Sequence, residues 1–194
     1  MTREIDSLAD RHAFEPADLP AGRKAIGVRW VYAYKYNPDG LIIKGKEKAQ
    51  LVAQGFSQCP EDFDETYAPV AKITSIHIIL AFAAANDLEI MASDVKTAFL
   101  HCKLCNEIYC KQIPGHPLAD PKQVLHLLVA LYGLRQSAFK FYMLIWKCFT
   151  SLGMHRCEVD HAVFSGTWTV PPHHSIPTYS SFEYAAFCNY SYPC

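Results

Sequence analysis

The spacing of apolar residues predicts a series of strands in the first part of the chain. Residues 28–36 and 51–56 are rich in aromatic and aliphatic residues, and residues 37–40, Asn-Pro-Asp-Gly, are a strong turn signal. Residues 41–44 can return antiparallel to the strand before the turn. We therefore expect a meander of strands in this region.

The next segment changes from a period of two to a helical period. Apolar residues recur at helical spacing from Ser75, which is a good N-cap residue, to about Asn86. Residues 88–95 form an apolar run that ends on a charge, Asp94, and are typical of a buried strand. A helix that packs on a strand is expected here.

The second half repeats this mixture of strands and helices. Strands are predicted over residues 107–112, with a turn at 103–106, and over residues 124–129. A helix is predicted from Gln136 to about Gly153, which would take the position after the helix end. Strands and helices in this order favour an α+β fold, with an antiparallel sheet and packed helices.

The two ends differ from the middle of the chain. Residues 1–21 are polar and contain two prolines, so we expect a flexible lead-in. Residues 169–194 are rich in proline and aromatic residues without a regular period, so we expect an irregular tail. Residues 22–168 are then the folded domain.

Composition narrows the classes of function. Of the 194 residues 51% are hydrophobic and 19% are charged, which excludes extensive disorder, and the net charge of −1 excludes a global basic field. Residues 22–54 nevertheless carry seven Lys or Arg against two Asp or Glu, a local charge of +5. This face either holds phosphates or is an ordinary solvated strand face.

The sequence also bears on the location of the protein. We find no apolar run long enough for a membrane span and no apolar stretch of a secretory signal near the first residues. The eight cysteines are then expected to be reduced thiols. These features predict an intracellular protein, cytoplasmic or nuclear, that is not secreted and has no membrane partner.

Asp94 is the acidic residue whose position suggests chemistry. A carboxylate at the end of a strand can hold Mg²⁺ in a two-metal site, provided that a second carboxylate lies close by. Taken alone, Asp94 is better explained as a surface or capping aspartate, because single acidic residues at strand ends are common.

Six segments in order resemble the reverse transcriptase of copia-type retrotransposons. The resemblance covers about residues 25–165. Its segments are WVY at 30–32, NPDG at 37–40, KAQLVAQGFSQ at 48–58, DETYAPVAK at 64–72, DVKTAFL at 94–100 and ALYGLRQ at 130–136.

This resemblance implies a partial right-hand polymerase, with fingers up to about residue 56 and an incomplete palm that starts at about residue 75. Asp94 matches the first metal-binding carboxylate, and Val95 matches the position where the backbone approaches metal and triphosphate. Phe99 matches the steric gate that excludes a ribose 2′-hydroxyl. The implied cofactor is Mg²⁺.

The same resemblance assigns the substrate-binding residues. Lys48 lies in the motif that grips the incoming triphosphate, and Tyr132, Gly133 and Gln136 lie in the motif that supports the template and the nascent base pair. The implied partners are an RNA template, a DNA primer and deoxynucleotides, and the sequence does not identify which proteins it binds.

Several departures from the family pattern weaken the implied activity. Gln50 replaces the arginine of a Lys-Ala-Arg motif, and Ser137-Ala138 replace Ala-Pro. After Asp160 the sequence has no aspartate, so the Val-Asp-Asp motif with the second carboxylates is missing. We expect a truncated reverse transcriptase that is inactive alone. A polymerase completed elsewhere, a nucleic-acid-binding remnant that uses the basic 23–48 face and a non-functional relic remain as alternatives.

A zinc site is a competing hypothesis for the cysteines. Cys102 and Cys105 have the spacing of a zinc knuckle, and Cys110 follows. A second ligand pair at the usual distance is missing from the sequence, which favours drift within a hairpin.

Overall fold

The computed structural model describes residues 2–168 and 182–187, which form two compact units. The first unit comprises Met1–Thr66 with Lys96–Phe141, and the second comprises Tyr67–Val95 with Tyr142–Cys194. Short 3-10 turns occupy Gly55–Ser57, Pro60–Asp62 and Ala98–His101. The helices are α1 (Thr2–Asp10), α2 (Ile73–Ala85) and α3 (Ser137–Ser151), and α3 runs from the first unit into the second.

The core of the first unit is a three-stranded antiparallel sheet in the order β1–β5–β4. Burial alternates along the middle strand β5, so that Leu125, Leu127 and Val129 face the core while the residues between them are less buried. This period of two is the reason that the segment is a strand. The strands are β1 (Phe14–Ala17), β4 (Lys103–Cys110) and β5 (Val124–Val129).

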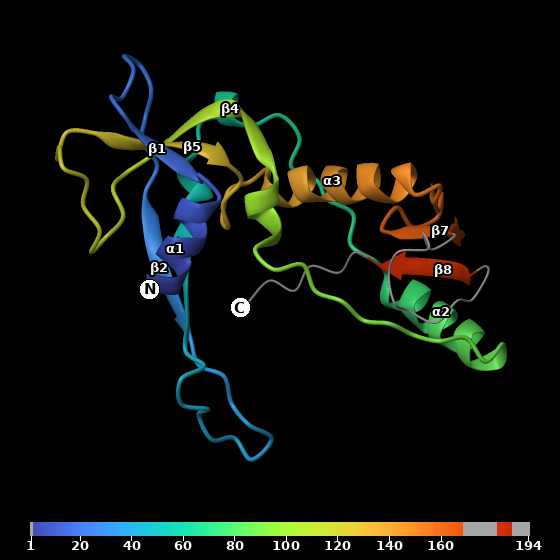
Figure 1. Cartoon of the computed structure of the whole chain (residues 1–194). Helices are drawn as coiled ribbons and strands as arrows, with labels where there is room; N and C mark the ends of the chain where they lie inside the picture. The colour runs from blue at the N-terminus through green and yellow to red at the C-terminus, as the bar shows by residue number, and fades with distance from the viewer. Residues whose placement is uncertain (1, 169–181, 188–194) are drawn as a thin grey trace. The chain divides into compact units, whose positions relative to one another are not determined.

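The second sheet of this unit is the antiparallel pair β2 (Val28–Ala33) and β3 (Lys48–Ala53). The loop between the two strands extends away from the sheet as a long arm (Figure 1). At the predicted turn the side-chain oxygen of Asn37 accepts a hydrogen bond from the Leu41 amide at 2.7 Å, and Gly40 adopts a φ of +77°. The predicted turn is therefore confirmed, but the predicted return strand over residues 41–44 is wrong. The strand that pairs with β2 is β3, and residues 41–44 contribute an isolated bridge between Ile42 and Tyr36.

Residues 2–17 form regular elements, which differs from the expected flexible lead-in over residues 1–21. The side chain of Leu8 on α1 is 1% exposed in the core of the first unit. The β1 strand pairs with β5, with Phe14 opposite Leu127. Leu8 and Ala13 are buried in this core, and Ile5 and Phe14 pack against it, which residue composition does not reveal.

The second unit contains α2, most of α3 and a three-stranded antiparallel sheet. Its core includes the buried side chains of Tyr142, Met154 and Phe164. The last strand, β8, falls inside the expected irregular tail, and the other residues of 169–194 lie outside the described residues. The strands are β6 (His155–Arg156), β7 (Val163–Trp168) and β8 (Phe182–Phe187), in the order β6–β7–β8.

Three further predicted details are wrong. Residues 88–95 form no strand, and the exposed fractions of Ile90 and Met91 are 64% and 83%. A strand needs a neighbour for its backbone groups, and within the described part of the chain this segment has none. Helix α2 begins after Lys72 rather than at Ser75. Residues 103–106 belong to β4 rather than to a turn, because they continue the ladder beside β5 through a bulge.

The remaining elements agree with an α+β fold. Strand β5 has the predicted bounds, and α3 lies within the predicted range and is followed by Gly153 at a φ of +82°. The left-handed conformation of this glycine is typical of a helix C-terminus. Within the described residues, no helix is long and apolar enough to cross a membrane.

Candidate functional site

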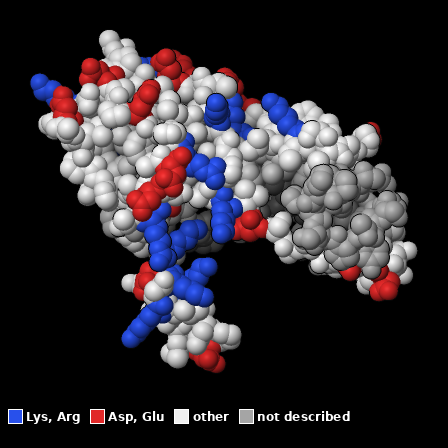
Figure 2. All heavy atoms as spheres, viewed as in Figure 1, with Lys and Arg blue, Asp and Glu red and all other residues white. Residues whose placement is uncertain are grey.

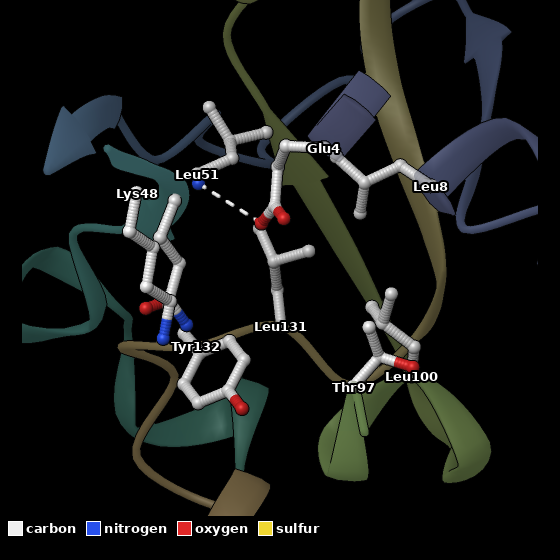
Figure 3. Close-up of a pocket in the computed structure, with 9 residues that line it drawn as sticks. Glu4, Leu8, Lys48, Leu51, Thr97, Leu100, Leu131 and Tyr132 are labelled. Atoms are coloured by element: carbon white, nitrogen blue, oxygen red, sulfur yellow. Dashed lines mark hydrogen bonds between the residues drawn. The ribbon is translucent and has the colours of Figure 1, made fainter. Parts of the chain in front are cut away.

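Two of the predicted substrate-binding residues line one small pocket in the first unit. The pocket has a volume of about 90 Å³, and Lys48 from β3 and Tyr132 from the loop after β5 lie side by side at its edge (Figure 3). Gln50, which replaces the family arginine, also lines the pocket and is 4% exposed. The other lining residues are Glu4, Leu8, Leu51, Thr97, Leu100 and Leu131.

Phe99 lies directly against Tyr132. The centroids of the two rings are 4.6 Å apart at an interplanar angle of 59°. Phe99 also forms a T-shaped pair with Phe141, with ring centroids 6.1 Å apart. Phe99 is 4% exposed, because these neighbours cover it. Tilted aromatic pairs of this kind are favourable. Phe99 therefore packs against Tyr132, and Tyr132 rather than Phe99 lines the pocket.

Gly133 holds its loop against the end of β3. Its φ is +88°, and a Cβ atom built on it would lie 2.1 Å from the carbonyl oxygen of Ala53. The amide of Ala53 donates to the carbonyl of Tyr132 at 2.7 Å, and the amide of Gly55 donates to the carbonyl of Gly133 at 3.2 Å. Only glycine fits this close approach of two backbones.

The side chain of Gln136 is buried and makes its hydrogen bonds to other residues of the first unit. The side chain is 1% exposed. Its Nε2 donates to the carbonyl of Asp62 at 3.1 Å, and its Oε1 accepts from Nε2 of Gln58 at 3.1 Å. Oε1 of Gln58 accepts in turn from the amide of Arg135 at 2.9 Å. These bonds give Gln136 a structural role that fixes the loop behind Tyr132.

Basic side chains gather on the arm and where it joins the sheet (Figure 2). Arg23 is an exception, since it forms an ion pair with Asp62 at 3.2 Å and donates to the carbonyl of Glu107. The other six basic residues of the segment are exposed, and we call them the basic face: Lys24, Arg29, Lys35, Lys44, Lys46 and Lys48.

Asp94 and Val95 belong to the second unit, whereas the other predicted site residues belong to the first. Both are exposed, in a segment without regular secondary structure. In the ranges that the structure describes, no group of three or more His, Cys, Asp or Glu side chains could hold a metal ion. These residues do not fit a two-metal site, which needs several carboxylates around the ions.

The zinc hypothesis for the cysteines has no support in the described residues, for the same reason. Cys102 and Cys110 are buried, and burial raises the pKa of their thiols to about 11 and about 12. A thiol with a raised pKa is a poor metal ligand, because the thiolate is the form that binds.

Glu4 is a pocket residue that sequence reasoning missed. Its Oε1 accepts a hydrogen bond from the Leu51 amide at 3.2 Å (Figure 3). Burial raises the pKa of Glu4, against the lowering effects of this bond and of the charge of Lys48. The helical spacing of Glu4 and Leu8, one turn apart, is the signal that could have indicated an ordered helix here.

Asp160 is a second missed residue, and it replaces the predicted cap of α2. Its Oδ2 accepts from the Ser75 hydroxyl at 2.6 Å and from the Lys72 amide at 2.9 Å, and its Oδ1 accepts from the Ala162 amide at 3.1 Å. Burial acts to raise the pKa of Asp160, but these bonds outweigh it and lower the pKa. A carboxylate from a distant loop therefore satisfies the start of the helix.

The sequence of this chain is similar to one protein family and to polyproteins of plant transposons. Residues 11–169 match the family described as "Reverse transcriptase (RNA-dependent DNA polymerase)". The retrovirus-related Pol polyprotein from transposon TNT 1-94 of Nicotiana tabacum is 41% identical over 145 residues, which are 74% of this chain and 11% of that relative. The Pol polyprotein from transposon RE1 of Arabidopsis thaliana is 35% identical over 167 residues, 84% of this chain and 11% of the relative. No solved structure matches.

Proposed function

The chain belongs to the reverse transcriptase (RNA-dependent DNA polymerase) family, and from this premise we propose that it is a part of a copia-type Pol polyprotein that binds nucleic acid but does not polymerise by itself. The observation that carries the proposal is the arrangement of the predicted residues within the first unit. Lys48 and Tyr132 line one pocket there, and Phe99 packs against Tyr132.

The basic face supports binding of a polyanion. Its six exposed cations lie on and beside one hairpin, and Lys48 adjoins the aromatic side chain of Tyr132 at the pocket. Cations on a phosphate backbone next to an aromatic ring are a common arrangement in nucleic-acid binding. The proposed ligand is an RNA template paired with a DNA primer, and the proposed small-molecule ligands are deoxynucleotides.

The proposed lack of polymerase activity rests on carboxylates. In the family the Mg²⁺ sites need an Asp-Asp pair in addition to the first aspartate. After Asp160 this sequence has a single acidic residue, Glu183. The exposed segment 88–95 supports the same proposal, because the segment that carries Asp94 forms no strand and has no strand neighbour among the described residues.

Reduced cysteines support the expected intracellular location, in the cytoplasm or the nucleus. The six cysteines in the described residues are free thiols. Thiols persist in the reducing compartments of the cell.

Primer extension on an RNA template with Mg²⁺ and deoxynucleotides tests the catalytic half of the proposal. We expect no extension, and measurable extension would contradict it. Affinity for an RNA–DNA hybrid, measured at several salt concentrations, tests the binding half. We expect affinity to fall steeply with salt, since each phosphate contact releases a counterion. Weak binding that does not change with salt would instead indicate a non-functional relic.

A pair of charge variants makes the binding test specific. Lys44→Gln with Lys46→Gln removes two cations from the basic face. The slope of the logarithm of the binding constant against the logarithm of the salt concentration should therefore become less steep by about two. The matched control is Lys103→Gln with Lys111→Gln, two exposed lysines of the first unit outside the basic face. An equal loss in both variants would indicate nonspecific attraction rather than binding at this face.

A further inference from the structure

Helix α1 places an acidic side chain in the pocket that contains Lys48. Glu4 points from the helix into the pocket, and its carboxylate lies between the β3 backbone and Leu131 (Figure 3). Glu4 and Lys48 carry the two opposite charges of the lining residues, and the others are neutral at pH 7. Opposite charges in a partly dry pocket interact more strongly than they do on an open surface.

Two contacts fix the position of Glu4, one at its carboxylate and one through its helix. The Leu51 amide donates to its carboxylate at 3.2 Å, and Leu8, one turn along the same helix, is buried in the core. The carboxylate is therefore built into the pocket instead of moving freely in solvent. Its raised pKa, caused by burial, agrees with a carboxylate that has lost part of its hydration.

We propose that Glu4 is an affinity-determining residue of the Lys48 site, where its carboxylate provides the counter-charge that an incoming phosphate must replace. This inference rests on the proposed function, in which Lys48 receives a phosphate of the nucleic acid or the nucleotide. A phosphate that approaches Lys48 is repelled by Glu4, so the resting pocket binds polyanions less tightly than the basic face alone would.

The test is a set of charge variants whose affinity for an RNA–DNA hybrid is measured at fixed salt. Glu4→Gln removes the charge and keeps an oxygen that accepts the bond from Leu51, so the helix stays in place. We expect this variant to bind about threefold more tightly, the size typical of a single partly exposed charge pair. Circular dichroism of each variant verifies that it folds.

Two controls distinguish an effect of Glu4 in the pocket from the effect of a change in the net charge of the protein. Glu47→Gln removes an exposed acid next to Lys48 in sequence that does not line the pocket. It should change the affinity by much less than Glu4→Gln. In a Lys48→Gln background the gain from Glu4→Gln should largely disappear, because the two charges then no longer act on the same ligand.

The outcomes distinguish this inference from the proposed function. If the unaltered protein binds with a steep salt dependence but Glu4→Gln changes nothing, or Glu47→Gln gains as much, the role of Glu4 is refuted and the proposed function stands. If neither the unaltered protein nor Glu4→Gln binds, both fail. If Glu4→Gln alone binds, Glu4 has the proposed role and the basic face is blocked in the resting protein.

Discussion

The two units of this protein differ in the local structure around the residues that match the family motifs. In the first unit the loop with Tyr132, Gly133 and Gln136 is held by backbone and amide hydrogen bonds to residues 53–62. In the second unit the segment that carries Asp94 is exposed and irregular. A segment is ordered and buried where the described residues give it packing and hydrogen-bond partners, and it is exposed where they do not.

Helix α2 of the second unit supports the same conclusion. It is apolar on all sides, yet Ile73, Ile78 and Phe82 are 64%, 63% and 53% exposed, while Ala83 is buried. A helix that is apolar all round is typical of the interior of a larger assembly of elements. The large cluster of buried apolar side chains lies in the first unit, whereas α2 in the second unit exposes several large apolar side chains.

The largest expected effect tests the rigid loop of the first unit. Gly133→Ala should destabilise this unit by at least about 3 kcal/mol, because a Cβ atom would overlap the Ala53 carbonyl and the backbone has a positive φ. Urea unfolding followed by tryptophan fluorescence measures the change. Gly40→Ala is the matched control: its φ is also positive but nothing lies within 4 Å of its Cβ position, so it should cost about 1 kcal/mol. Equal costs would show that the close approach does not matter.

A smaller effect is expected at Asp160, a buried carboxylate of the second unit. Asp160→Ala should destabilise this unit by about 2 kcal/mol, because the amides of Lys72 and Ala162 and the hydroxyl of Ser75 lose their acceptor. Ser75→Ala removes only one of these bonds and should cost about half as much. Thermal unfolding monitored by circular dichroism compares the two. A larger loss in Ser75→Ala would contradict the assigned role of Asp160.

The lowered pKa of Asp160 predicts a weaker, pH-dependent effect in the same unit. The folded-state pKa lies below the unfolded value of about 3.9, so the stabilisation is complete above about pH 4 and is lost as the pH falls through the folded pKa. Melting temperatures between pH 6 and pH 2 should therefore fall more steeply for the unaltered protein than for Asp160→Asn. Parallel curves would show that this carboxylate does not control acid stability.

The smallest expected effect returns to the pocket of the first unit. Gln50→Arg should stabilise this unit by about 1 kcal/mol, since a guanidinium there can pair with the half-buried carboxylate of Glu4 and the pocket has room for the longer side chain. The same substitution in a Glu4→Gln background should give no gain. Stability curves of the four proteins form a double-mutant cycle, and a gain that persists without the Glu4 charge would exclude pairing as its cause.

Local sequence determined much of the fold. The alternation over residues 124–129, the Asn-Pro-Asp-Gly turn and the glycine that ends α3 are each recognised from neighbouring residues, and the structure has all three. The ordered motifs were also sufficient to identify the family, because six segments at similar spacing rarely occur together by chance. These features depend on short stretches of chain and on backbone preferences within them.

Tertiary structure alone decided which of these residues meet. Gln136 is buried because Gln58 and Asp62, more than seventy positions earlier, receive its side chain, and Asp160 caps a helix that begins 87 positions before it. Glu4 enters the pocket of Lys48 because α1 packs on β3, and residues 88–95 remain exposed because no described strand pairs with them. Hydrogen-bond partners and strand neighbours come from distant parts of the chain, so the pattern of a single segment cannot specify them.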